Sequence, residues 1–271
     1  MSRRNNRQFQ SFRPAGVGYQ IPVWRIQITA NLFPCRVAVG WLSPHFDEYY
    51  LAGSHRPSPT KELLDQNRRL LRVGRLLRDR LAPVYTEGAI GELHADYAPY
   101  IARLLGDPVV QQKLKQGFQL KLIDLHKVCA LQTVLSLNYV ARIAAMLDPS
   151  DPLSTARVAL PMTLSPRLVM PALSVNARSL EVTSISAPQP TQPISHIHVA
   201  KLNGKYLLTD GHHRGYAFLK AGVQFVPGFY IEATTYASLG LAPGLLPASM
   251  LNKSRPPMLT DFMIDGFAVD L

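Results

Sequence analysis

The segment from His196 to Ala233 constrains the fold most, because it fixes the order of two strands, a helix and a further strand. The segments from His196 to Leu202 and from Lys205 to Thr209 flank Asn203-Gly204, the residue pair best suited to a two-residue type I′ turn. This pattern predicts a β-hairpin. Helical spacing then predicts a helix between Gly211 and Gly222, followed by a strand that runs to Ala233.

Apolar periodicity predicts further elements before the hairpin. Leucines at helical spacing indicate a helix from Lys61 to Leu81, and Asp107 with Pro108 is typical of an N-cap and first helical residue. The remaining expected elements are a helical stretch from Glu87 to Leu105 interrupted near Pro99, strands at Val23 to Thr29, Arg36 to Trp41, Phe118 to Ile123 and Ser179 to Ile185, and a long apolar helix from Leu125 to Leu147 capped by Asp124.

A strand that ends at Asp210 and is followed at once by a helix predicts a phosphate-binding site at the helix N-terminus. Backbone N–H groups at a helix start lack partners, and the helix dipole there favours an anion. Gly211 lets the backbone approach a ligand, His212 and His213 carry hydrogen-bond donors, and Arg214 offers a fork that matches phosphate oxygens. The Asp210 carboxylate is suited to hold Mg²⁺ or to accept a proton from a hydroxyl.

Each of these residues also has a purely structural interpretation. Asp-Gly pairs are common in turns, and the polar residues that follow would then cap and solvate the helix start. His196 and His198 alternate on a strand and share a face, which is more typical of a solvated sheet surface than of a metal site, because no third ligand stands at a suitable spacing. Cys35 and Cys129 have no neighbouring cysteine and are interpreted as packing thiols.

The run from Asp210 to Arg214, followed by Ala217 and by Ala221-Gly222-Val223, resembles the ParB/sulfiredoxin superfamily. Its members place a Gly-x-x-Arg motif between a hairpin strand and a helix and bind nucleotide phosphates there. The resemblance covers about forty residues and extends more weakly to 118–143. The resemblance implies a nucleotide ligand such as ATP, ADP or CTP, which Gly211, His212, His213 and Arg214 would bind. It also implies Mg²⁺ as a candidate metal and Asp210 as the candidate catalytic residue.

The activities known in this superfamily are separated only in part by the sequence. A sulfiredoxin has a cysteine beside the motif glycine, where this chain has His212, so sulfur chemistry is not expected. A partition protein has a helix-turn-helix domain after the nucleotide domain, and the residues after Ala233 are too few and too rich in proline for one. The Asp-Gly-His-x-Arg form is similar to the kinase members, but a second catalytic carboxylate is not evident; Glu232 is the candidate.

The resemblance implies an α+β fold, with a small mixed-sheet ParB/sulfiredoxin-like domain and a mainly helical N-terminal region. We predict this region at 1–116, the mixed-sheet domain at 117–235 with a Pro-rich insertion at 148–195, and a C-terminal tail at 236–271. Whether the protein is a nucleotide-binding module, a phosphotransferase or nucleotide hydrolase, or a non-specific DNA-associated protein stays open at this point, as does the identity of the nucleotide.

The net charge of +11 is concentrated in the N-terminal part of the chain, where residues 1–116 hold 17 Lys and Arg against 9 Asp and Glu. Such an excess attracts polyanions by counterion release, so nucleic acid is a candidate partner of arginines such as Arg68, Arg72 and Arg75. Pairing with Glu62, Asp65 and Asp79 is the alternative. No apolar run has the length of a membrane span and no secretory signal is evident, so we expect a cytoplasmic protein without a membrane partner.

Overall fold

The computed structural model describes residues 34–42, 61–84, 86–162, 173–175, 182–184, 195–241, 245–246 and 248–270. Of residues 63, 64, 173–175 and 182–184 only the backbone is described. The strand predicted at Val23 to Thr29 lies outside the described residues.

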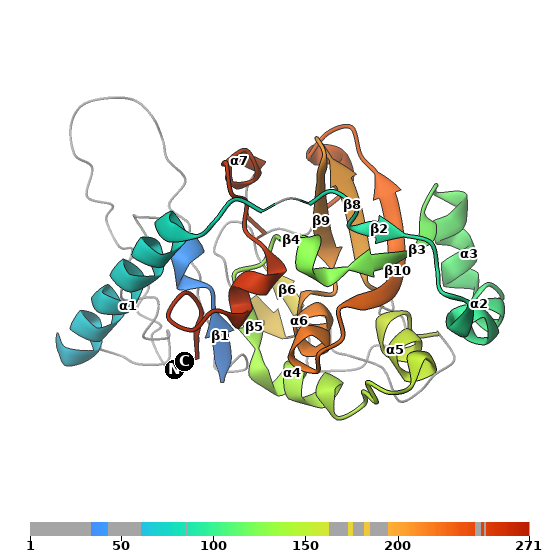
Figure 1. The fold of residues 1–271 in the computed structure, drawn as a ribbon, viewed down its shortest axis with the longest axis horizontal. Coiled ribbons are helices and arrows are strands. Elements are labelled where there is room, and N and C mark those ends of the chain that lie inside the picture. Colours follow the sequence, from blue (N-terminus) through green and yellow to red (C-terminus); the bar gives the residue numbers. More distant parts are fainter. Residues whose placement is uncertain are drawn as a thin grey trace, which may run out of the picture.

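A six-stranded mixed sheet forms the centre of the molecule (Figure 1), with the strand order β2-β3-β10-β8-β9-β4. Its members are β2 (Ile90–Gly91), β3 (Gln119–Asp124), β4 (Cys129–Ala130), β8 (His198–Leu202), β9 (Lys205–Asp210) and β10 (Phe225–Glu232). Strand β10 runs parallel to β8, and β4 runs parallel to β9, whereas the other neighbours are antiparallel. The predicted α+β class with a mixed sheet is therefore confirmed.

The predicted hairpin, motif helix and following strand are all present. Strands β8 and β9 are joined at Asn203 and Gly204, whose φ angles of 50° and 75° both lie in the left-handed region that a type I′ turn requires. Helix α6 (His212–Lys220) follows directly, and Gly222, with a φ of 77°, ends it before β10 begins.

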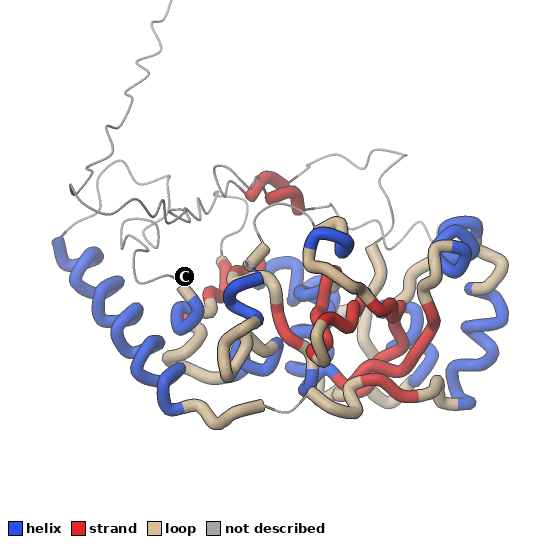
Figure 2. Tube along the Cα trace, turned by 90° about the horizontal axis from the view of Figure 1, so that it is seen from above, coloured by secondary structure: helices blue, strands red, loops and turns tan. Residues whose placement is uncertain are grey.

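Helices surround this sheet on several sides (Figures 1 and 2). Helix α1 (Lys61–Arg80) lies at one end of the molecule, and α2 (Ala98–Leu104) and α3 (Pro108–Lys115) lie at the other. Helices α4 (Leu137–Ala144), α5 (Pro152–Ala159) and α6 pack along one side of the sheet. The helices at Lys61 and at Pro108 were predicted, and Asp107 accepts the N–H of Val109 at 2.9 Å as the expected N-cap.

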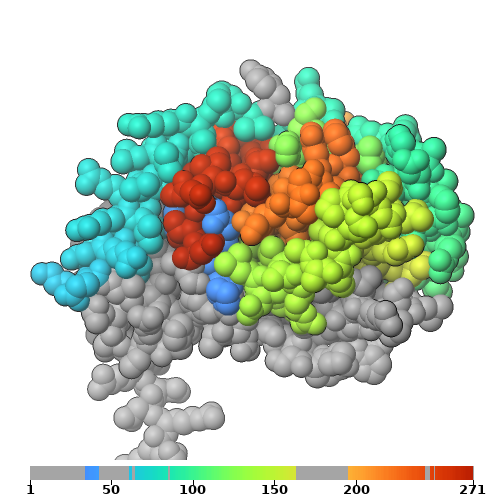
Figure 3. Space-filling view, turned by 60° about the horizontal axis from the view of Figure 1, so that its bottom comes forward, coloured from blue at the N-terminus to red at the C-terminus, as the bar shows by residue number. Residues whose placement is uncertain are grey.

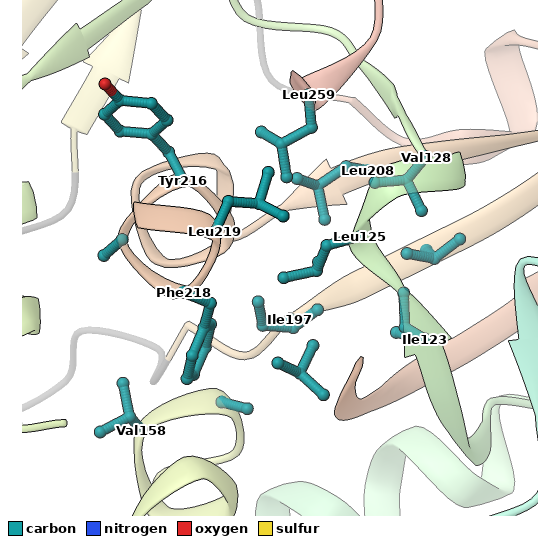
Figure 4. Close-up of a cluster of buried hydrophobic side chains, with 14 of the residues drawn as sticks. Ile123, Leu125, Val128, Val158, Ile197, Leu208, Tyr216, Phe218, Leu219 and Leu259 are labelled. Atoms are coloured by element: carbon teal, nitrogen blue, oxygen red, sulfur yellow. The ribbon is translucent and has the colours of Figure 1, made fainter. Parts of the chain in front are cut away.

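The main core lies between α6 and the sheet (Figure 4). Phe218 of α6 extends toward Val158 of α5, while Leu219 faces Leu125 and Leu208. All of these side chains are buried. The tyrosines of the helical segments, Tyr97, Tyr100 and Tyr139, are also buried, as their positions on apolar stripes indicate.

A second, three-stranded sheet joins distant parts of the chain in the order β11-β1-β5, formed by β11 (Val269–Asp270), β1 (Cys35–Val37) and β5 (Val134–Ser136). Figure 3 shows the residues near 260–270 lying directly over β1. Leu259, Phe262 and Phe267 belong to the main core. The predicted segments 1–116, 117–235 and 236–271 thus each contribute one strand to this sheet, and Leu259, Phe262 and Phe267 of the predicted tail are buried.

Helix α1 is held against this second sheet region by close backbone contact. A Cβ atom added to Gly74 would lie 2.9 Å from the backbone nitrogen of Gly40, within the 3₁₀ turn Val39–Trp41. Arg78 also donates to the carbonyl of Gly40 at 3.3 Å. The remaining elements are α7 (Ala248–Leu251), the 3₁₀ helix Leu259–Met263, and an isolated two-stranded sheet of β6 (Leu173–Val175) and β7 (Val182–Ser184), the latter inside the predicted strand at Ser179 to Ile185.

Three predicted elements are wrong or incomplete. The apolar run from Leu125 to Leu147 is not one helix, because Asp124 caps only a 3₁₀ turn through His126, and β4, β5 and the short α4 follow. The stretch from Glu87 to Leu105 contains β2 and a 3₁₀ turn before α2 begins beside Pro99. Of the strand predicted at Arg36 to Trp41, only Arg36 and Val37 belong to β1, and Val39–Trp41 forms a 3₁₀ turn.

Candidate functional site

The turn between β9 and α6 has the geometry that a glycine permits and other residues resist. Gly211 has φ 93° and ψ 21°, in the left-handed region, and it is the N-cap of α6. A Cβ atom at this position would lie 3.2 Å from the Cα of Ile197. Gly211 is therefore packed closely against the backbone of Ile197. The backbone N–H groups of the first helical residues, His212 to Arg214, point out of the N-terminal end of the helix, as in any α-helix.

Asp210 is placed by a β-bulge. The register of β8 and β9 shifts by one residue, so that Val199 pairs with Leu208 but His198 pairs with Asp210, which leaves Thr209 as the extra residue. Bulges redirect side chains and are frequent beside binding sites. The half-buried Asp210 carboxylate accepts hydrogen bonds from Ser195 Oγ at 2.8 Å to each oxygen.

His212 and His213 hold the backbone of the neighbouring segment. Nε2 of His212 accepts the N–H of Leu131 at 3.0 Å, and Nε2 of His213 accepts the N–H of Ser136 at 3.0 Å. Both imidazoles must therefore be neutral with the proton on Nδ1. Burial lowers the pKa of His212 to about 3 and that of His213 to about 4. The predicted ligand-binding histidines thus use one ring nitrogen each to connect α6 to the 131–136 segment.

Arg214 lies in the interior beside the turn, with an exposed fraction of 6%. Its Nη1 donates to the carbonyl of Ala159 at 3.3 Å, and it forms no ion pair with any residue that the structure describes. Burial lowers the pKa of the guanidinium, and the charge of Asp210 acts in the opposite direction. A guanidinium carries five N–H donors, so most of the donors of Arg214 are left for another acceptor.

The predicted solvated surface at His196 and His198 is wrong, because both side chains are enclosed by the protein. His196 is 1% exposed, and its Nε2 lies 3.0 Å from the carbonyl oxygen of Pro161. The two imidazoles stack with ring centroids 6.0 Å apart, and Phe229 meets both of them edge to face. Phe118 covers His198 from the other side, at 5.4 Å.

Two ring nitrogens in this cluster have no hydrogen-bond partner among the described residues. They are Nδ1 of His196 and Nε2 of His198, and both atoms are buried. Such orphaned polar atoms are uncommon in folded proteins and cost free energy unless a water or a ligand satisfies them. The pKa of both histidines is lowered, first by burial and then by the charge of Lys113, to about 4 for His196.

Lys113 of α3 completes the cluster. Its ammonium lies over the rings of Phe118 and Phe229 at 5.5 and 5.6 Å from the centroids. Burial lowers the pKa of this amine, while the charge of Asp210 counteracts the shift. The site therefore combines two cations, Lys113 and Arg214, with the carboxylate of Asp210 and the nearby carboxylate of Asp107, in surroundings that exclude much of the water. Such an arrangement attracts an anion.

The structure thus brings together Asp210, Gly211 and Arg214 of the predicted site and adds Lys113, His196, His198 and Ser195 to them. Glu232, the candidate second carboxylate, is exposed; it accepts a hydrogen bond from Tyr230 at 2.8 Å and pairs with Lys201 at 3.3 Å.

The two cysteines are buried, which raises the pKa of each thiol to about 12 and fits their interpretation as packing residues.

The fold and this cluster define an α+β protein with a buried cationic site at a strand-to-helix turn. A scan against protein-family models, a search of curated proteins and a search of solved structures found no match. Over the described residues there is no group of three or more His, Cys, Asp or Glu side chains arranged to hold a metal ion. In the same part of the chain, none of the helices is both long and apolar enough to cross a membrane.

Proposed function

We propose that this protein binds a small phosphate-bearing ligand, a nucleotide in the first instance, at the turn formed by Gly211 and the start of α6. The observation that carries the proposal is the buried guanidinium of Arg214, a residue of the first turn of α6, which has one hydrogen bond to the described protein. Burying such a charge is costly unless an acceptor completes its hydrogen bonds.

Phosphate is the acceptor that fits this arrangement best. The helix dipole and the N–H groups favour an anion, and a guanidinium binds two oxygens of one phosphate in parallel. Gly211 allows the left-handed turn that begins α6 and the close packing of this turn against Ile197. The resemblance of Asp210 to Arg214 to the ParB/sulfiredoxin motif supports a nucleotide as the bearer of the phosphate. The cytoplasm, where nucleotides are abundant, is the compartment proposed with it.

Calorimetry with ATP, ADP, CTP and GTP, each with and without Mg²⁺, tests this proposal and identifies the base that is preferred. Arg214→Lys keeps the positive charge but removes the planar guanidinium that can bind two phosphate oxygens at once. We expect this variant to weaken binding by about 1.5–3 kcal/mol. Arg142→Lys on the exposed side of α4 is the matched control and should bind like the unmodified protein. No binding of any nucleotide at millimolar concentration would contradict the proposal.

Phosphoryl transfer is the second candidate, because Asp210 already accepts a hydroxyl hydrogen bond, from Ser195. A carboxylate in this position is suited to take the proton of an acceptor alcohol or water as its oxygen bonds to phosphorus and the bridging P–O bond of the nucleotide breaks. The leaving nucleotide carries away the electron pair of that bond. Arg214 would stabilise the charge on the phosphoryl oxygens.

The enzyme and the binding module respond differently to one substitution. Asp210→Asn should abolish nucleotide turnover and leave nucleotide affinity nearly unchanged if the protein is a phosphotransferase or hydrolase. Release of inorganic phosphate from ATP or CTP is the measurement. If the unmodified protein releases none and transfers none to a hydroxyl acceptor, while it still binds nucleotide, the binding module is the correct function.

A further inference from the structure

We propose that Lys113, His196 and His198 form a second anion-binding subsite beside the Gly211 turn, which binds a second phosphate or carboxylate group of the ligand together with a proton. This inference rests on the proposed function and specifies its ligand as a molecule with two anionic groups. The subsite is not part of the Asp210 to Arg214 motif, because its three residues come from α3 and from the start of β8.

The position of the subsite follows from the sheet register. His198 pairs with Asp210 across β8 and β9, and directly paired residues project to the same face of a sheet. The ammonium of Lys113 lies over Phe118 and Phe229, and these rings contact the two imidazoles. The charges of Lys113 and Arg214 accordingly lower the pKa of both His196 and His198. The second subsite therefore lies next to the first, on one face of the sheet.

The orphaned nitrogens indicate what is bound there. The imidazoles are neutral and packed by Phe118 and Phe229, yet Nδ1 of His196 and Nε2 of His198 are without a partner among the residues the structure describes. Lys113 has no ion pair in that part of the chain either, although its ammonium is partly buried. A compact oxyanion would satisfy all three groups, since it accepts several hydrogen bonds at once.

The hydrogen bond to Pro161 explains why a proton accompanies this group. A carbonyl oxygen can only accept, so Nε2 of His196 carries the hydrogen and Nδ1 of the neutral ring presents a lone pair. A lone pair facing an anionic oxygen is repulsive unless a proton lies between them. Binding should therefore take up one proton from solvent, which lies between Nδ1 of His196 and the ligand oxygen. The negative charge of the bound anion then offsets the repulsion between the protonated His196 and the nearby cations.

The charged groups around His196 agree with this direction. Lys113 of α3 and Arg214 of α6 disfavour its protonation in the free protein, whereas Asp107, the N-cap of α3, favours it. Asp210, at the end of β9, raises the pKa of both Lys113 and Arg214 and so favours their charged forms. An added dianion or trianion changes the balance toward the protonated ring, so affinity for the second anionic group should rise as the pH falls.

Titration calorimetry of the full chain with inorganic phosphate and with pyrophosphate near neutral pH tests the subsite. We expect pyrophosphate to bind at least about tenfold more tightly than phosphate, and Lys113→Met to reduce this ratio of affinities to about one. Lys113→Arg should retain most of the pyrophosphate affinity. Lys115→Met, on the exposed side of the same helix, is the control and should behave like the unmodified protein.

Proton uptake is measured by repeating the pyrophosphate titration in buffers of different ionisation enthalpy. The unmodified protein should take up about one more proton per pyrophosphate than His196→Asn does. Equal affinity for phosphate and pyrophosphate, unaffected by Lys113→Met, would overturn the second subsite and leave the proposed function intact. Failure of both anions to bind, with Arg214→Lys also without effect on nucleotide, would instead overturn the proposed function and the subsite with it.

Discussion

His213 Nε2 lies 3.0 Å from the backbone nitrogen of Ser136 and accepts its hydrogen bond, which ties the first turn of α6 to the end of β5. The equivalent bond from Leu131 to His212 lies one residue earlier in the helix. His212 and His213 therefore hold the turn between β9 and α6 through its first helical residues. In the proposed complex, direct contact with the ligand is left to Arg214 and to the backbone around Gly211.

His213→Phe should destabilise the fold by about 1–3 kcal/mol, because the ring still fills its space but the Ser136 N–H loses its acceptor. Urea unfolding measures this change in free energy. His126→Phe is the control, since His126 is exposed and its side chain has no hydrogen bond among those described. An unchanged unfolding midpoint in His213→Phe would show that the contact contributes nothing.

The free energy of unfolding should decrease as the pH falls, at pH values above those at which most carboxylates are protonated. Burial lowers the pKa of His196 and His213 to about 4 and that of His212 to about 3, whereas an unfolded histidine has a pKa near 6.5. The unfolded chain binds protons that the folded chain excludes, so stability is complete above about pH 6.5 and is lost progressively as the pH falls toward about 4.

The test is urea unfolding between about pH 7.5 and about pH 5, a range in which most carboxylates stay ionised. A free energy of unfolding that is constant over this range would contradict the assigned protonation states. The triple replacement of His196, His212 and His213 by neutral residues, if it folds, should reduce the pH dependence in the same range, and the lowered pKa of His198 should account for what remains.

Gly211→Ala should weaken both the fold and the binding of phosphate. A left-handed conformation costs a residue with a Cβ about 1–2 kcal/mol, and the new methyl would also press on Ile197. Gly91→Ala is the control, because that position in β2 has no positive φ and its nearest neighbour would be 4.0 Å away. Equal unfolding midpoints for the two variants would show that the turn geometry is not required.

Asp261→Ala should cost about 3–5 kcal/mol, because this fully buried carboxylate accepts hydrogen bonds from three directions. Trp41 Nε1 donates to it at 2.6 Å, the backbone of Met258 at 2.9 Å, and the guanidinium of Arg255 pairs with it. Asp265→Ala is the control: its side chain is 96% exposed although it pairs with Arg36 at 2.8 Å, so thermal unfolding should change little.

Nucleic acid stays a candidate partner of α1. Arg69 and Arg72 are exposed on this helix, whereas Arg68 pairs with Asp65 and Arg78 with Asp79, each at 3.0 Å. Arg3, Arg4, Arg7 and Arg13, which would extend a basic surface beside this helix, lie outside the described residues. Replacing Arg69 and Arg72 by Gln should reduce the salt slope of DNA binding by about one unit per charge, measured by electrophoretic shift at about 50 and about 200 mM salt. No shift at the lower salt would exclude this partner.

The hairpin and the motif helix could be predicted because their signals are local. The φ angles of Asn203 and Gly204 follow from the two residues themselves, and Gly211 and Gly222 delimit the helix in the same way. The apolar run after Asp124 was misassigned for a different reason. Buried strands and buried helices are both continuous apolar runs, and only the pairing of β4 with β9 and of β5 with β1 separates them.

The extent of the site could not be predicted because it depends on tertiary packing. His196 and His198 have the alternation of a surface strand, and they become buried only because Phe118 and Phe229 cover them. Lys113 belongs to the site because α3 packs over the same end of the sheet. No sequence signal links a lysine on that helix to a histidine more than eighty positions later. Of Lys113, His196 and His198, the sequence analysis considered only the two histidines.

The three-stranded sheet of β11, β1 and β5 has a kinetic consequence. Arg36 bonds to Asp270 across 234 positions of the chain, and closing so long a loop carries a large entropic cost before any contact offsets it. The hairpin, α6 and β10 lie within forty residues of one another and can assemble first. We therefore expect contacts of β1 with β11 to form after the rate-limiting step, so that weakening them accelerates unfolding and shortens the lifetime of the native state without slowing folding.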